Sequence, residues 1–135
     1  ILGCGSSTPS LKRNPASQLV NICENYFLID CGEGTQLQMR KFGVKFQRIN
    51  HIFISHLHGD HYLGLIGLVQ SMHLLGRKND LHIYAHADLE ELINHHLNVS
   101  QSKLNYKIVF HYLNYEKKEQ IFDSKNFIKR KSKAI

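Results

Sequence analysis

The hydrophobic positions of the chain follow two periods, and their order along the sequence predicts an α/β protein. Short β-rich apolar runs bounded by glycine or polar turns predict strands. They lie at residues 1–2, 17–22, 26–31, 49–55, 81–84 and 106–112, with further candidates at 120–122 and 127–129. The second and third runs are separated only by Cys23, Glu24 and Asn25, which predicts a hairpin. Residues 52–54 are apolar in succession, a pattern typical of a strand that is buried on both faces.

Three segments between these strands carry helical signals. Residues 35–43 form a short segment that ends at Gly43, as helices often do. Residues 62–75 form a longer helix with one apolar face, made by Leu65, Leu68, Val69, Met72 and Leu75. Residues 88–97 predict a third helix, with Asp88 near its start, where a carboxylate suits the helix dipole. Because strands and helices alternate, we expect an α/β fold, and 135 residues suit one small domain over residues 1–135.

The composition of the chain indicates which classes of partner to expect, without identifying one. The formal net charge of +6 at pH 7 favours a polyanionic partner such as a nucleic acid. Residues 125–135 hold five basic side chains, and this run predicts either an RNA-binding arm or an ordinary solvated end. Three cysteines without metal-finger spacing, and no secretory signal, indicate a reducing intracellular compartment. No apolar run approaches the roughly 20 residues that cross a bilayer, so we expect no membrane partner.

The densest set of chemical groups follows directly on the apolar run at 52–54. Within six residues it holds His56, His58, Asp60 and His61. Imidazole nitrogens and a carboxylate suit zinc, and also manganese or iron. The carboxyl end of a strand in an α/β sheet is where such proteins build their sites. The sequence therefore predicts a metal centre at this loop.

These four ligands fit two ions more easily than one. We expect His56 and His58 on one ion, and Asp60 and His61 on a second. Two ions about 3.5–4 Å apart lower the pKa of a bridging water and stabilise charge on a phosphoryl group. The pattern therefore favours a metal-dependent hydrolase of phosphodiesters. The remaining histidines are expected to be ordinary surface or core residues: His51, His73, His82, His86, His95, His96 and His111.

The block at residues 55–61 matches the His-x-His-x-Asp-His signature of the metallo-β-lactamase superfamily. Residues 27–36, which read Phe-Leu-Ile-Asp-Cys-Gly-Glu-Gly-Thr-Gln, resemble the ribonuclease Z family within it, as do the glycines and leucines of residues 64–68. The resemblance implies a metallo-β-lactamase αβ/βα sandwich, of which this chain covers roughly the first half. It also implies a zinc-dependent endoribonuclease that removes the 3′ trailer from precursor transfer RNA. A cytoplasmic homodimer is implied by the same family.

The resemblance also implies a role for each matching residue. His56 and His58 would bind one Zn²⁺, and Asp60 and His61 the other. Asp60 would in addition act as the catalytic general base. Asp30 would lie beside the metal ligands and orient them. The loop of Lys12, Arg13 and Asn14 would lie near the RNA 3′ end, although Lys12 and Arg13 are equally compatible with ordinary loop charges.

Part of the family's ligand set has no counterpart in the sequence. The family uses a third histidine, a bridging aspartate and a final histidine further downstream, and no histidine follows His111. We therefore expect residues 1–135 to be the N-terminal part of a single metallo-β-lactamase-type domain. Two alternatives stay open. One is another hydrolase of the superfamily, acting on a thioester, a lactone or a small phosphodiester. The other is a catalytically incomplete chain that binds only metal or RNA.

Overall fold

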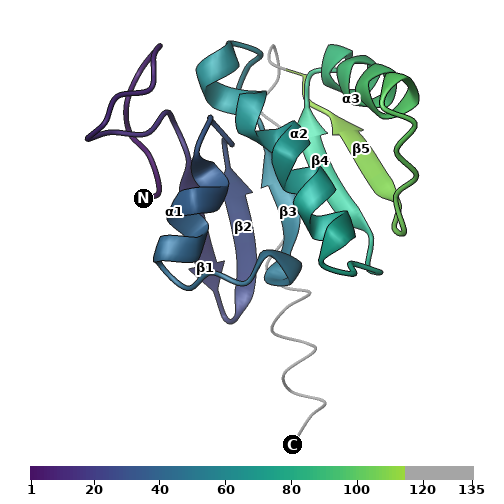
Figure 1. The fold of residues 1–135 in the computed structure, drawn as a ribbon, viewed down its shortest axis with the longest axis horizontal. Helices are drawn as coiled ribbons and strands as arrows, with labels where there is room; N and C mark the ends of the chain where they lie inside the picture. Colours follow the sequence, from purple (N-terminus) through teal and green to yellow (C-terminus); the bar gives the residue numbers. More distant parts are fainter. Residues whose placement is uncertain (115–135) are drawn as a thin grey trace, which may run out of the picture.

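The structure, a computed structural model, describes residues 1–114 and contains one five-stranded sheet (Figure 1). Along the sheet the order is β1 (Gln18–Ile22), β2 (Asn25–Ile29), β3 (Ile49–Phe53), β4 (Leu81–Ala85) and β5 (Ile108–Tyr112). β1 pairs with β2 antiparallel, and every later pair is parallel. The predicted α/β class is confirmed. The strand candidates at 120–122 and 127–129 and the basic segment 125–135 lie outside the described residues.

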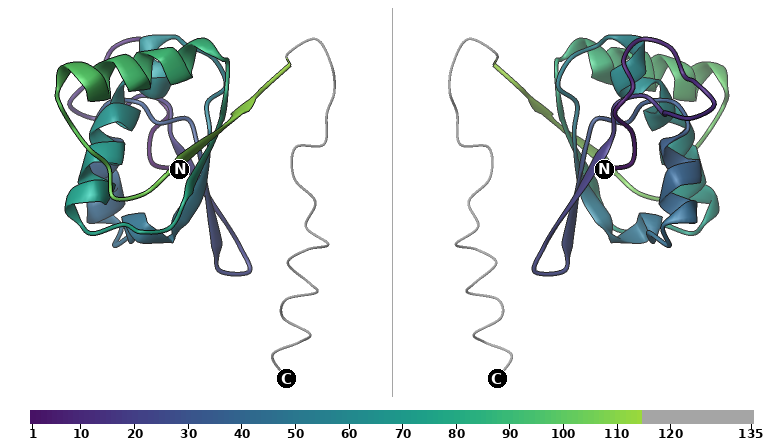
Figure 2. Two further views of the ribbon diagram at one scale, coloured as in Figure 1. Left: turned by 90° about the vertical axis from the view of Figure 1, so that its right-hand side faces the viewer. Right: turned by 90° about the vertical axis from the view of Figure 1, so that its left-hand side faces the viewer.

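Each parallel connection carries a helix, and the helices cover one face of the sheet (Figures 1 and 2). α1 (Thr35–Lys41) joins β2 to β3, α2 (Gly59–Leu74) joins β3 to β4, and α3 (Asp88–Val99) joins β4 to β5. A 3₁₀ turn, η1 (Phe46–Arg48), directly precedes β3. Because β2, β3 and β4 are parallel, their carboxyl ends meet at the same edge of the sheet. The loops that leave this edge build the site described below.

The core lies between this helical layer and the sheet. Leu28, Ile52 and Ile83 stand in register on three neighbouring strands, and all three are fully buried. The apolar face predicted for α2 packs against them, with four of its five side chains buried: Leu65, Leu68, Val69 and Met72. The prediction is wrong for Leu75, which follows the end of α2 and is 54% exposed.

The opposite face of the sheet carries a row of rings across β3, β4 and β5. The ring of Tyr84 stacks on those of Phe53 and His111, with centroids 4.4 and 4.3 Å apart. His51 stacks on His82 at 5.1 Å. The expectation that residues 52–54 are buried on both faces is wrong for the described residues, because Phe53, whose ring stacks on that of Tyr84, is only partly buried. The sheet register also brings together three histidines that the sequence left as unrelated.

Two local predictions at the amino end have different outcomes. The hairpin between β1 and β2 is confirmed, with Cys23 and Glu24 both at positive φ, as a two-residue turn of type I′ requires. The strand expected at residues 1–2 is wrong, since only two isolated bridges form nearby, Gly3 with Ser17 and Gly5 with Pro15. Proline cannot donate to a ladder, so the pairing does not extend.

Candidate metal centre

The centre of the site is the connection between β3 and α2. The strand ends at Phe53, and the fully buried Ile54 anchors the chain before it emerges at the exposed Ser55. α2 begins at Gly59, so Asp60 and His61 lie in its first turn and not on a loop before residue 62, as the sequence suggested. The positive end of the helix dipole favours a carboxylate at this position.

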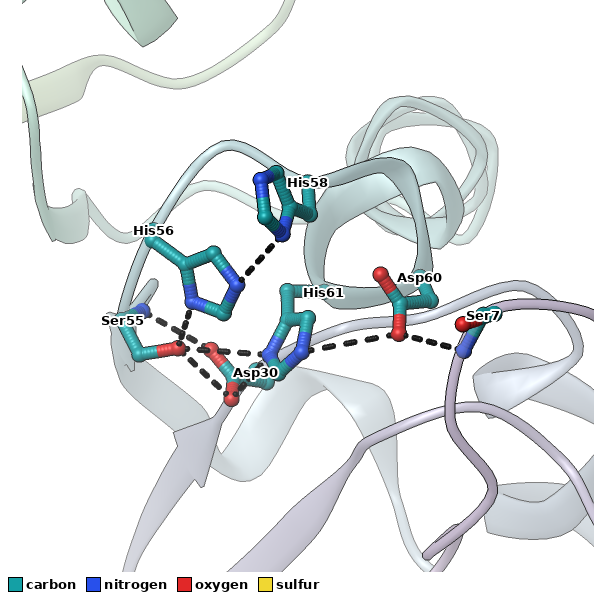
Figure 3. Close-up of polar contacts among 7 residues, drawn as sticks. All are labelled: Ser7, Asp30, Ser55, His56, His58, Asp60 and His61. Atoms are coloured by element: carbon teal, nitrogen blue, oxygen red, sulfur yellow. Dashed lines mark hydrogen bonds and ion pairs between the residues drawn. The ribbon is translucent and has the colours of Figure 1, made fainter.

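The structure brings the four predicted ligands together (Figure 3). His56 Nε2 lies 3.1 Å from His58 Nδ1, and the rings of His56 and His61 have centroids 4.0 Å apart. His61 Nε2 lies 3.6 Å from Asp60 Oδ2. The side chains thus place His56 beside His58 and Asp60 beside His61, and the role of these two pairs as metal ligands stays a prediction.

Asp30 lies beside this cluster, directly after the end of β2 (Figure 3). Its backbone has a positive φ of 57°, and the residue is 7% exposed. Oδ1 accepts the Ser55 backbone N–H at 2.8 Å. Oδ2 lies 2.8 Å from His61 Nδ1 and accepts the Ser55 hydroxyl at 3.0 Å. A carboxylate at this distance from a histidine nitrogen fixes the orientation of the ring.

A second fixed carboxylate is Asp60. Its Oδ2 accepts the backbone N–H of Ser7 at 2.8 Å, and Ser7 itself has a positive φ of 63°. This hydrogen bond is the largest cause that lowers the pKa of Asp60 below its ordinary value, and the neighbouring His61 and His58 act in the same direction. Asp60 is therefore ionised at neutral pH, the form that binds a cation. Sequence reasoning missed Ser7, although the glycine-rich turn of residues 3–7 was visible.

A close backbone contact joins the Asp30 loop to α2. Cys31 N–H donates to His61 O at 2.7 Å, and Gly64 N–H donates to Cys31 O at 2.9 Å. A Cβ atom built on Gly64 would lie 2.2 Å from the carbonyl oxygen of Gly32. Glycine at position 64 is thus required by packing, and the contact holds Asp30 within reach of His61.

The separations of the donor atoms fit a metal ion. Two ligands on one tetrahedral zinc, each about 2.0–2.2 Å from it, lie roughly 3.3–3.6 Å apart. The separation of the His61 and Asp60 donor atoms, 3.6 Å, lies within this range, and that of the His56 and His58 nitrogens, 3.1 Å, lies just below it. Among residues 1–114 no group of three or more His, Cys, Asp or Glu side chains is arranged around one ion. The division of the four donors between two ions stays a prediction.

The loop of Lys12, Arg13 and Asn14 lies beside α1, where its side chains line a surface hollow with Gln38 and Lys41. Lys12 and Arg13 are exposed. Ser7, at the start of the same loop region, is the residue that reaches Asp60. The loop is thus tied to the centre through Ser7, whereas a contact of the two basic side chains with RNA stays a prediction.

The sheet, the single helical layer and the histidine-rich loop after β3 define a protein of the metallo-β-lactamase fold. The short form of human tRNase Z superposes with a TM-score of 0.77 and 34% identity, over 85% of this chain and 46% of that one. The metallo-β-lactamase fold protein YhfI from Bacillus subtilis, at 20% identity, shares the fold with a TM-score of 0.65, over 89% of this chain and 48% of that one.

A family model described as Anti-Pycsar protein Apyc1 matches residues 1–132, and the chain belongs to this family. The resemblance to ribonuclease Z is confirmed by sequence relatives. A protein named Ribonuclease Z from Phocaeicola vulgatus is 49% identical over 126 residues, which are 93% of this chain and 41% of that protein. Another of that name, from Methanococcus aeolicus, is 41% identical over 95% of this chain and 40% of its own length. The chain thus spans about two fifths of the length of these relatives.

No helix within residues 1–114 combines the length and the apolar character needed to cross a bilayer.

Proposed function

We propose that the chain supplies the metal-binding half of a zinc-dependent endoribonuclease that removes the 3′ trailer from precursor transfer RNA. The observation that carries the proposal is the convergence of His56, His58, Asp60 and His61 at one edge of the sheet. The relatives named Ribonuclease Z and the fold shared with human tRNase Z support the choice of RNA as substrate.

In this proposal His56 and His58 hold one Zn²⁺, and Asp60 and His61 hold the other. Bound zinc lowers the pKa of an attacking water and stabilises charge on the phosphoryl oxygens. Asp60 is ionised under the influence of Ser7 and accepts a proton from the attacking water as general base. Asp30 keeps the ring of His61 in place throughout. The net charge of +6 favours approach of the RNA backbone.

The test is cleavage of a precursor transfer RNA that carries a 3′ trailer. The protein is used at the length at which its own cell expresses it, and the assay is run with and without Zn²⁺. We expect trailer removal that a chelator abolishes and zinc restores. Asp60→Ala and His58→Ala should each lower the rate by at least 100-fold, because general bases and metals contribute on that scale. His95→Ala, an exposed change on α3, serves as control. A zinc-loaded protein that leaves the trailer intact would refute the proposal.

A second candidate is hydrolysis of a small phosphodiester at the same centre. It is kept as a candidate because the matching family model is described as Anti-Pycsar protein Apyc1, a description that names no transfer-RNA nuclease. The assay is release of nitrophenolate from bis(4-nitrophenyl) phosphate, measured beside RNA cleavage. Turnover of the small ester without trailer removal would favour this candidate. Metal binding without turnover of either substrate would favour a catalytically incomplete chain.

We also propose that residues 1–135 form part of one domain of a cytoplasmic homodimer. Sedimentation of the same polypeptide should give twice its mass, and cell fractionation should place it with cytoplasmic markers. A monomer at micromolar concentration would contradict the dimer.

A further inference from the structure

The hydroxyl group of Ser55 has three polar neighbours but only one proton to give. Its Oγ lies 3.0 Å from Asp30 Oδ2, 3.0 Å from His56 Nδ1 and 3.3 Å from His61 Nδ1 (Figure 3). Ser55 is not one of the predicted ligands, yet it touches a residue of each donor pair. Which atom carries each proton can be worked out from the donors and acceptors alone.

The carboxylate of Asp30 acts only as an acceptor of hydrogen bonds. Ser55 must therefore donate its single proton to Asp30 Oδ2, since two oxygen lone pairs would otherwise face each other at 3.0 Å. His61 Nδ1, 2.8 Å from the same oxygen, must likewise carry a proton. In a neutral ring that leaves the lone pair of His61 on Nε2, the atom that faces Asp60.

The Ser55 hydroxyl in turn fixes the tautomer of His56. Because the Ser55 proton is used on Asp30, Ser55 Oγ can only accept from His56 Nδ1. His56 Nδ1 therefore carries the proton, and the lone pair of the neutral ring lies on Nε2. This is the atom 3.1 Å from His58 Nδ1, within the first donor pair.

We propose that Ser55 is a positioning residue that links Asp30 to His56, because it donates its proton to Asp30 and accepts the proton of His56 Nδ1. One carboxylate thereby sets the tautomer of a ligand in each donor pair. His61 is set directly, and His56 is set through the Ser55 hydroxyl. The proposal deepens the proposed zinc centre and rests on it for the use of the Nε2 atoms as ligands. The assignment of the tautomers does not depend on zinc.

The backbone provides a clean way to remove the hydroxyl alone. The Ser55 N–H to Asp30 Oδ1 hydrogen bond, at 2.8 Å, survives Ser55→Ala, so the loop keeps its attachment. Because Ser55 is exposed, Ser55→Thr has room for its methyl group and retains the hydroxyl. Ser71→Ala is the matched control, on α2 about 15 Å along the helix from His61.

Two measurements test the proposal on the full chain. The first is long-range ¹H–¹⁵N NMR of the imidazoles at pH 7.5 with chelator present, which shows which ring nitrogen carries the proton. We expect His56 and His61 as Nδ1–H tautomers, with His56 alone shifting toward Nε2–H in Ser55→Ala. The second is the affinity for Zn²⁺ alone, measured by competition with a chromophoric chelator. Ser55→Ala should bind about 10–100-fold more weakly, the usual effect of losing a partner of a ligand, while Ser55→Thr stays near the unchanged chain.

The outcomes separate this inference from the proposed function. An Nε2–H tautomer of His56 in the unchanged chain overturns the inference. So does a Ser55→Ala chain whose His56 nitrogen shifts and zinc affinity match those of Ser71→Ala. If neither the unchanged chain nor the variants bind zinc, the metal centre is refuted, while the tautomer comparison still decides the role of Ser55. Loss of trailer cleavage with the tautomers as expected contradicts only the choice of substrate.

Discussion

Replacing Gly64 with alanine places a methyl group where the structure has a backbone contact. The added Cβ would lie 2.2 Å from Gly32 O and 2.9 Å from Cys31 O. A normal contact requires the two segments to separate by about 1 Å, and overpacking of this kind costs about 1–3 kcal/mol. The displacement also weakens two backbone hydrogen bonds, from Cys31 N to His61 O and from Gly64 N to Cys31 O, each contributing about 1 kcal/mol. Alanine offsets about 1 kcal/mol of this loss in the free energy of unfolding, because its helix propensity is higher than that of glycine.

The expected net loss for Gly64→Ala is thus about 2–4 kcal/mol in the free energy of unfolding, by the overpacking and hydrogen-bond magnitudes. Gly67→Ala is the matched control on the same helix. Its Cβ meets only Gln36 Nε2, at 2.8 Å, the far end of a flexible side chain that can move aside. There the helix propensity should dominate, so we expect a change between zero and a gain of about 1 kcal/mol.

Urea unfolding followed by circular dichroism measures both variants. With a urea m-value of about 2 kcal/mol/M, the midpoint of Gly64→Ala should fall by roughly 1–2 M relative to the unchanged chain. Equal midpoints would refute the argument that a backbone contact requires glycine at position 64. A normal midpoint for Gly64→Ala with weakened zinc binding would show that the contact positions Asp30 without stabilising the fold.

Three further changes have defined outcomes. Asp30→Asn replaces one of the two acceptor oxygens with an N–H₂ donor, so the side chain can no longer accept both the Ser55 backbone N–H and the Ser55 and His61 side chains. Zinc affinity measured by chelator competition should therefore fall by about 10–100-fold, and an unchanged affinity contradicts the role given to Asp30. Burial, reinforced by the neighbouring histidines of β4 and β5, lowers the pKa of His51 to about 4 from its ordinary 6.5. Since the unfolded chain binds more protons between these values, stability should fall as the pH drops from 6.5 to 4. In His51→Phe the urea midpoint should depend less on pH, whereas in His95→Gln on α3 the dependence should be unchanged. Equal slopes of midpoint against pH in the two variants would contradict the role given to His51. Free Zn²⁺ at 100 times its dissociation constant should raise the unfolding free energy by about 2.7 kcal/mol, and excess chelator should remove the gain; a midpoint unaffected by zinc excludes tight binding to the folded chain.

The order of the elements could be predicted because each strand and helix has its own hydrophobic period. The apolar stripe from Leu65 to Met72 and the apolar run at 52–54 are patterns within single elements, and the structure forms a helix and a strand at these positions. The four ligands could be predicted for the same reason, since they lie within six residues. The start of α2 was placed three residues too late, because a ligand-bearing loop and the first turn of a helix have the same composition.

The remaining features depend on contacts between distant segments. Ser7 reaches Asp60 across 53 residues through a backbone N–H, which no side-chain pattern reveals. His51, His82 and His111 are isolated in the sequence and become neighbours only through the register of β3, β4 and β5. The hydrogen bonds of Ser55 appear only once Asp30 is placed beside it by the pairing of β2 with β3.

The polar contacts of the centre also bear on the order of events during folding. Asp30 meets Ser55 across 25 residues and His61 across 31, and both contacts require β2 and β3 to be parallel neighbours joined through α1. Parallel pairing must close a long loop before any stabilising contact forms, and it is therefore slow. We expect the segment from His56 to His61 to exist early as a flexible, histidine-rich stretch that can capture metal loosely. Its oriented form arrives only after the sheet has closed, so tight binding of metal during refolding should follow the pairing of β2 with β3.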